Sequence, residues 1–323
     1  MSRFLKLLCC VLCLLVFGGW GFFAHRKINR LAVFTLPPAM MPFYKRHIAY
    51  LEETSVNPDR RRYAVPDEAA RHYIDLDAYG DSAAYRLPRY WRDALAQWSE
   101  DTLQARGILP WHIHRVYLQL REAFLLRDPA RVLRISAELG HYVADAHVPL
   151  HTTSNYDGHK TGQHGLHGFW ESRLPELFFG EYDFLVGKAT YIEHVQVHAW
   201  QAVTTSAAAV DSVLALEKEL SRTQGDRKYA FETKGRQTVK VFSTGYSRAY
   251  HQVLNGMVER QMRASVKMIG DLWFSAWVDA GQPDLSDWHK YQPTEEELKA
   301  RKEELERWRA ANLPTRDHEK ENR

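Results

Sequence analysis

Two histidine–carboxylate pairs are the residues of this sequence whose types and spacing suit metal chemistry. His141 and Asp145 lie four positions apart, and His167 and Glu171 repeat that spacing. Residues four apart share one face of a helix, so each pair can point two ligands in the same direction. His151 lies between the pairs, after a proline that we expect to end the first helix and turn the chain back. One such pair arises often by chance, but two pairs with an intervening histidine favour a metal site over scattered surface groups.

The available ligand types point to zinc. Imidazole and carboxylate groups without thiolates suit a catalytic zinc ion. The cysteines Cys9, Cys10 and Cys13 all lie near the N-terminus, so the body of the chain has no thiol for a disulfide or a metal–thiolate bond. Metal ligands in this chain must therefore be histidines, carboxylates and backbone groups.

Helices are the elements that must position these ligands. Apolar residues recur at helical spacing from Pro88 onward, and no segment shows the period-two alternation that would indicate a sheet. We therefore expect an all-α, multi-helix bundle, in which ligands from facing helices can converge. Residues 54–86 are polar and rich in turn formers. The expected helices cover residues 20–35, 41–53, 88–104, 109–127, 128–147, 164–178, 188–220, 236–280 (with a break) and 294–311.

Length and composition fit an ordinary globular protein. The chain has 323 residues, of which 45% are hydrophobic, so it can bury a sizeable core. Its formal net charge of +3 is too small to attract nucleic acid or an acidic membrane by bulk electrostatics. No Gly-rich phosphate loop occurs, so no nucleotide cofactor is expected, and nothing indicates a stable protein partner.

The two ends of the chain differ from its body. Residues 1–19 combine a basic start with a short apolar run, which is typical of a secretory signal peptide; an uncleaved anchor is the alternative. We therefore expect export, to the periplasm, the envelope or the medium. Residues 20–285 form the helical domain. Residues 286–323 are a highly charged tail, which we interpret as a solvated helix rather than a partner-binding one.

Further motifs stand in order with the two pairs. Trp20 and Gly21 precede His25, and Asp59 is followed by Arg62. The segment His72-Tyr73-Ile74-Asp75 places a histidine three residues before an aspartate. The two pairs and His151 then give the pattern His-x3-Asp-x5-His followed by His-x3-Glu. Between Trp20 and Glu171 this set resembles the superfamily of zinc-dependent phospholipases C and single-strand-specific nucleases. A glutamate as the last ligand, here Glu171, resembles the phospholipase branch, whereas a tryptophan just before it, here Trp170, resembles the nuclease branch.

The resemblance implies up to three zinc ions at the bottom of a cleft. One ion would be held by Asp59, His72, His141 and Asp145, a second by His151, His167 and Glu171, and a third by His25, Asp145 and the amino group and carbonyl of Trp20. Asp145 would then bridge two ions. The amino group of Trp20 is free only after the signal peptide is removed, so maturation would complete the site.

The implied activity is hydrolysis of a phosphodiester. A hydroxide bridging two zinc ions would attack phosphorus, with Asp59 orienting or deprotonating the water and Asp145 as the second catalytic carboxylate. Asn155 is a candidate for substrate contact, and Asp75 either contacts substrate or bonds to a ligand histidine. The substrate is a phospholipid or a single-stranded nucleic acid. A non-catalytic, zinc-stabilised envelope module is the alternative.

Two smaller expectations concern basic and aromatic residues. The run from Arg60 to Arg62 is expected to be a solvated turn, with a phosphate clamp beside Asp59 as the alternative. Trp111 is expected in the core, with the neighbouring His112 at the surface.

Overall fold

The computed structural model describes residues 22–234, 237–311 and 313. This part of the chain is mostly helical, as the sequence predicts. The proposed signal peptide and Trp20 lie outside the described residues.

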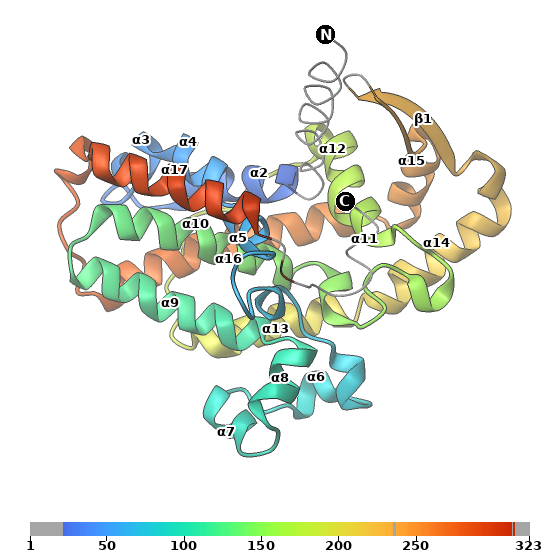
Figure 1. Ribbon diagram of the computed structural model, residues 1–323, viewed down its shortest axis with the longest axis horizontal. Coiled ribbons are helices and arrows are strands. Elements are labelled where there is room, and N and C mark those ends of the chain that lie inside the picture. Colours follow the sequence, from blue (N-terminus) through green and yellow to red (C-terminus); the bar gives the residue numbers. More distant parts are fainter. Residues whose placement is uncertain (1–21, 235–236, 312, 314–323) are drawn as a thin grey trace, which may run out of the picture.

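Figure 1 shows the arrangement of the helices. The α-helices are α2 (Phe22–Ala32), α3 (Met41–Arg46), α4 (Ile48–Thr54), α5 (Asn57–Arg61), α6 (Ala83–Arg86), α7 (Trp91–Leu95), α8 (Glu100–Arg106), α9 (Leu109–Leu125), α10 (Pro129–Ala146), α11 (Leu166–Gly168), α12 (Leu174–Phe178), α13 (Val195–Ala207), α14 (Val210–Gln224), α15 (Thr244–Val253), α16 (Met257–Asp279) and α17 (Glu295–Ala310). The 3-10 helices that matter for the site are η2 (Ala69–His72) and η4 (Pro149–Thr152), and η6 (Phe169–Arg173) is a π-helix.

Helix α10 is the centre of the bundle. It packs against α9, α16, α2 and α4, and its apolar side chains are almost completely buried. Two local signals fix its start, because Pro129 occupies its first turn and the Asp128 side chain accepts a hydrogen bond from the Arg131 amide. The helix ends at Ala146, before Pro149, as the sequence predicts.

Large aromatic side chains fill the core around α10. Tyr44 stacks on Trp273, with ring centroids 5.0 Å apart, and Trp111 meets Trp200 edge to face at 5.1 Å. Such pairs add specific geometry to the burial of apolar area. The predicted burial of Trp111 is confirmed, but the surface position predicted for His112 is wrong, since its side chain is also buried.

A β-hairpin departs from the all-α prediction. Strands β1 (Tyr229–Lys234) and β2 (Gln237–Phe242) pair antiparallel, with Tyr229 opposite Phe242. The hairpin packs against the bundle through Phe242, whose ring stacks on Phe169 at 3.8 Å. The helix predicted from residue 236 therefore begins only at α15. In the second strand Val239 and Val241 alternate with polar residues and with exposure, but this pattern is only a few residues long.

Several other predicted helices are shorter or divided. Residues 88–104 form α7 and α8 with a break between them, and 188–220 is extended before α13 starts. In the charged tail, Thr294 caps α17 through a capping box with Glu297, and none of the helix residues is buried. Among the described residues, no helix combines the length and the apolar character that crossing a membrane requires.

Candidate metal centre

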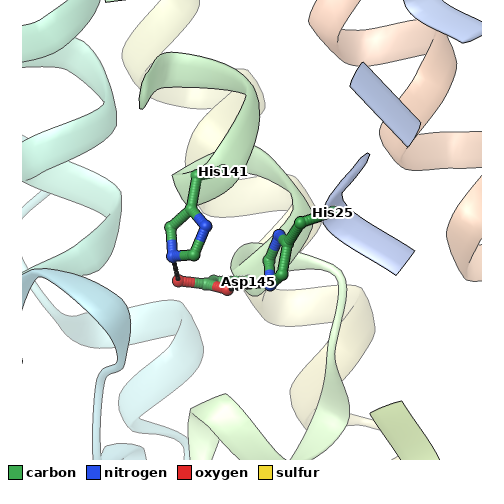
Figure 2. Close-up of side chains that lie close together, drawn as sticks. All are labelled: His25, His141 and Asp145. Atoms are coloured by element: carbon green, nitrogen blue, oxygen red, sulfur yellow. Dashed lines mark ion pairs between the residues drawn. The ribbon is translucent and has the colours of Figure 1, made fainter. Parts of the chain in front are cut away.

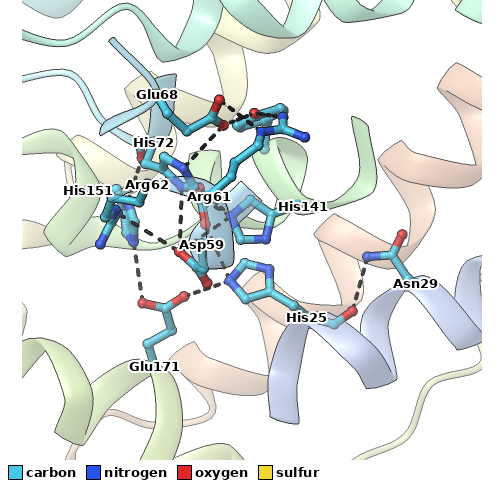
Figure 3. Close-up of polar contacts among 12 residues, drawn as sticks. His25, Asn29, Asp59, Arg61, Arg62, Glu68, His72, His141, His151 and Glu171 are labelled. Atoms are coloured by element: carbon cyan, nitrogen blue, oxygen red, sulfur yellow. Dashed lines mark hydrogen bonds and ion pairs between the residues drawn. The ribbon is translucent and has the colours of Figure 1, made fainter. Parts of the chain in front are cut away.

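Eight of the nine predicted metal ligands converge in one place, although their positions in the sequence span almost 150 residues. Figure 3 shows most of them, drawn from separate elements that surround the end of α10. The ligands are His25 of α2, Asp59 of α5, His72 of η2, His141 and Asp145 of α10, His151 of η4, His167 of α11 and Glu171 of η6. The ninth, Trp20, lies outside the described residues.

The first group consists of Asp59, His72 and His141, whose ligand atoms all lie within 4.8 Å of one another. The Nδ1 of His72 lies 3.0 Å from the Nε2 of His141, and each of these nitrogens is 3.7 Å from Oδ1 of Asp59. Asp145 completes the set, because its Oδ2 lies 3.0 Å from His72 Nδ1 and 3.4 Å from His141 Nε2. These are the four residues predicted for the first ion.

A second group shares Asp145 with the first. Figure 2 shows His25, His141 and Asp145, which together could hold a metal ion. The Nε2 of His25 lies 3.3 Å from Oδ1 of Asp145, whereas the other oxygen, Oδ2, faces His72 and His141. The Asp145 carboxylate therefore directs one oxygen to each group, which is the geometry that a bridging ligand needs.

The third group consists of His151, His167 and Glu171. Oε2 of Glu171 lies 3.3 Å from His151 Nε2 and 2.7 Å from His167 Nε2. Its second oxygen, Oε1, lies 3.0 Å from the Nε2 of His25. Glu171 thus links the third group to the second, a connection that the sequence did not predict.

The spacing of the donor atoms fits a metal ion. Four ligands placed tetrahedrally about 2.0–2.1 Å from a zinc ion are separated from each other by about 3.3 Å. The nitrogen–oxygen and nitrogen–nitrogen separations of the first group run from 3.0 to 3.7 Å. Each group could therefore hold a metal ion, and the chemistry of the donors, imidazole with carboxylate, suits zinc among the divalent metals.

Backbone contacts fasten the first group to the third. The Nδ1–H of His151 donates to the carbonyl oxygen of His72 at 2.5 Å, and the amide of Ile74 donates to the carbonyl of His151 at 2.9 Å. With its Nδ1 engaged in this bond, His151 has its Nε2 free to face Glu171. The turn after Pro149 therefore serves both to reverse the chain and to set the orientation of the His151 ring.

The loop before α11 is organised by a residue that the sequence analysis missed. The carboxylate of Asp157 accepts hydrogen bonds from the amides of Gly165, at 3.0 Å, and His167, at 3.2 Å. This places a carboxylate at the start of the short helix that carries His167. Its position ten residues before a ligand histidine gives no helical or motif signal.

Electrostatics within the cluster are dominated by its carboxylates. Burial alone would lower the pKa of His25, but Glu171, Asp145 and Asp59 raise it to about 9. Burial would raise the pKa of Asp59, but His141, Arg62 and His72 keep it below its usual value. The pKa of Glu171 is likewise held well below its usual value against its burial, by His151, His167 and His25. The carboxylates of the cluster therefore stay ionised, and they favour positively charged groups beside them.

The cluster reaches solvent on one side. The side chains of Asp59 and His167 are 21% and 28% exposed, whereas those of the other ligands are 8% exposed or less. Arg62 lies near this open side, with a guanidinium nitrogen 3.9 Å from Oδ1 of Asp59. A separate small pocket, lined in part by Trp170, borders the cluster at His25. A molecule from solvent would meet the ligands at Asp59 and His167.

The two residues predicted to contact substrate lie close to the cluster in sequence but outside the three groups. The side chain of Asn155 bonds within its own loop, to the amide of Lys160 and the hydroxyl of Thr161. Asp75 is buried, and its amide donates to the carbonyl of Arg106. Their contact with substrate stays a prediction.

The arginine run does not form a solvated turn throughout. Arg61 points inward, where it pairs with Glu138 and with the fully buried Glu68. Glu68 was missed by the sequence analysis, although it lies four residues before His72, the same spacing that marks the other pairs. Arg60 bonds to Asn57 and stays partly exposed.

No family model and no curated protein matches this chain. The interpretation of the centre therefore depends on its geometry.

Proposed function

We propose that the protein is a zinc-dependent phosphodiesterase, with up to three zinc ions bound by the three groups. One observation carries the proposal: the groups overlap through Asp145 and Glu171, so that ions in them would be neighbours, and the cluster is open to solvent at Asp59 and His167. Adjacent metal sites beside an accessible surface are the arrangement that phosphoryl chemistry uses.

Zinc in such a site lowers the pKa of water and offsets the negative charge of a phosphodiester. The protein groups then have distinct roles. Asp145 is 1% exposed and directs its oxygens to two groups, which suits a fixed bridging ligand. Asp59 lies at the open edge and has a lowered pKa, so it is ionised and able to orient a water molecule and accept its proton.

Openness separates this proposal from the alternative of a structural zinc module. Structural zinc sites usually have four protein ligands and no vacant position, whereas catalytic sites keep a position for water or substrate. The group of His151, His167 and Glu171 supplies three side chains, and one of them, His167, is accessible. This favours catalysis over a purely structural role.

The substrate proposed is a phosphodiester of either a phospholipid or a single-stranded nucleic acid. Both present a phosphate with a single negative charge, which the open side near Arg62 and Asp59 would meet. The two classes differ in what flanks that phosphate, so a direct comparison of substrates decides between them.

The test measures zinc content and hydrolysis on the same purified protein. Zinc per chain is determined by elemental analysis, and release of product is followed with single-stranded DNA, RNA and phosphatidylcholine, with and without a chelator. We expect bound zinc and chelator-sensitive cleavage of one class. His141→Ala should lose both, whereas His198→Ala, at an exposed histidine outside the three groups, should keep both. Protein that binds no zinc, or that cleaves none of the three substrates, would refute the proposal.

A further inference from the structure

Glu68 is a buried carboxylate behind the first group. Its side chain has no exposed surface, and it lies one helical turn before His72. Three donors surround it: Arg61 Nε at 2.9 Å and Arg71 Nη1 at 2.5 Å contact Oε2, and the hydroxyl of Tyr142 donates to Oε1. Burying a charged carboxylate costs free energy because its hydration is lost, and donors such as these compensate for that loss. Burial would raise the pKa of Glu68, but His72 and Arg61 hold it far below its usual value.

The ring of His72 lies between Glu68 and the cluster. Its Nδ1 lies 3.0 Å from Oδ2 of Asp145 and 3.0 Å from Nε2 of His141. Its Nε2 points the other way, is buried, and has no hydrogen-bond partner. The nearest acidic atom to that nitrogen is Oε1 of Glu68, at 3.7 Å. Figure 3 shows Glu68 on the side of His72 away from Asp59.

The ion pair with Arg61 does not by itself account for the position of the Glu68 carboxylate. Arg61 is already bound by Glu138, with nitrogen–oxygen distances of 2.8 and 3.2 Å. Glu138 is partly exposed and has no contact with the cluster ligands among the described residues, so it balances Arg61 without reaching His72. What Glu68 adds beyond its ion pairs with Arg61 and Arg71 is its second oxygen, which accepts from Tyr142 and faces His72.

We propose that Glu68 is a positioning residue for the metal centre, which holds the His72 ring through Nε2 so that Nδ1 is presented to the metal. Metal-bound histidines commonly direct their second nitrogen to a carboxylate, which fixes the ring tautomer and strengthens the ligand. Here the contact closes into a hydrogen bond when the ring moves toward Glu68 by less than about 1 Å. The inference rests on the metal binding of the proposed function, but not on its substrate.

The decisive comparison is between Glu68→Gln and Glu138→Gln in the full chain. Both substitutions remove one carboxylate from Arg61, but only the first removes the charge facing His72. Zinc affinity is measured by competition with a chromophoric chelator, and the absorption bands of the Co²⁺-loaded protein report the ligand geometry. We expect Glu68→Gln to weaken Zn²⁺ binding at the first group, which contains His72, by about 10- to 100-fold and to shift the Co²⁺ bands. Glu138→Gln should leave the zinc affinity within about twofold of that of the unmodified protein, and it should not shift the Co²⁺ bands.

A second measurement does not depend on the folding of a variant. In the unmodified protein labelled with ¹⁵N-histidine, long-range proton–nitrogen correlations report which nitrogen of His72 carries the proton. We expect Nε2, which faces Glu68, to carry a proton in both the metal-free and the zinc-loaded forms, whereas Nδ1 can donate to Asp145 only when no metal is bound. An Nε2 without a proton in the metal-free form, or equal zinc affinity of Glu68→Gln and Glu138→Gln, would overturn the inference. If no zinc binds at all, the proposed function fails, and the proton position in the metal-free protein still decides the role of Glu68.

Discussion

Asn29 of α2 occupies the space beside Gly140 of α10 that a side chain would fill. A Cβ atom at position 140 would lie 2.0 Å from the Oδ1 of Asn29, so the two helices approach this closely only because residue 140 is glycine. The side chain of Asn29 also contacts the preceding turn of α2, where its Nδ2 donates a hydrogen bond to the carbonyl of His25. Next to Gly140, the ring of His141 stacks on that of His25, with centroids 4.1 Å apart.

Gly140→Ala should therefore separate α2 from α10 and disturb the metal centre. Overpacking of a tight contact costs about 1–3 kcal/mol in the free energy of unfolding. We expect that loss together with weaker zinc binding at His25, measured by denaturant unfolding and by chelator competition. Gly270→Ala is the matched control, because its Cβ would lie 1.9 Å from Thr35 Oγ1, outside the three groups. A loss of stability without a change in zinc binding is expected there, and the same result for Gly140→Ala would contradict the proposed link.

The bridging position of Asp145 predicts a loss of more than one metal ion. Asp145→Asn keeps the size of the side chain but removes the charge that its two oxygens share between His25 and the pair His72 and His141. We expect zinc per chain, measured by elemental analysis, to fall at two sites. His167→Ala, which changes a ligand of one group only, should lower it at one site. Equal losses in the two variants would argue against a shared carboxylate.

The sequence predicts the ligands better than it predicts what holds them. Pairs four residues apart, such as His141 with Asp145, are visible because helical spacing alone places them on one face. Asp157 and Glu68 act through a loop amide and through the far side of a ring, and those contacts depend on how distant segments pack. The β-hairpin was missed because the alternation around Val239 and Val241 is short, whereas Phe242 is fixed by a distant contact, its stacking on Phe169.

Asp157 should matter for the third group although it is not a ligand. Asp157→Ala removes the acceptor of the Gly165 and His167 amides, so the start of α11 loses its cap and the His167 ring its fixed position. We expect a loss of about 1 kcal/mol in stability and a faster release of zinc to a chelator. Asp128→Ala removes a comparable cap from α10, where the Asp128 carboxylate accepts from the Arg131 amide. That control should lose similar stability without faster zinc release.

The buried His112 predicts a sensitivity to acid that is independent of metal. Burial holds the pKa of His112 well below 6.5, with Arg71 adding to the effect, while both ring nitrogens are without hydrogen-bond partners. The unfolded chain therefore binds a proton at a higher pH than the folded one. Stability from this residue is complete above about pH 6.5 and is lost as the pH falls, by up to about 1.4 kcal/mol for each unit.

His112→Leu should remove this dependence, since leucine fills the site and cannot be protonated. The free energy of unfolding of the chelator-treated variant should fall less steeply between pH 6.5 and 5 than that of the unmodified protein. Its value at pH 7 should be equal or higher, because an imidazole with unpaired nitrogens no longer has to be buried. His198→Leu, at an exposed histidine, should keep the original slope. Parallel slopes for all three proteins would show that His112 is not neutral in the fold, and that the acid loss comes from the carboxylates alone.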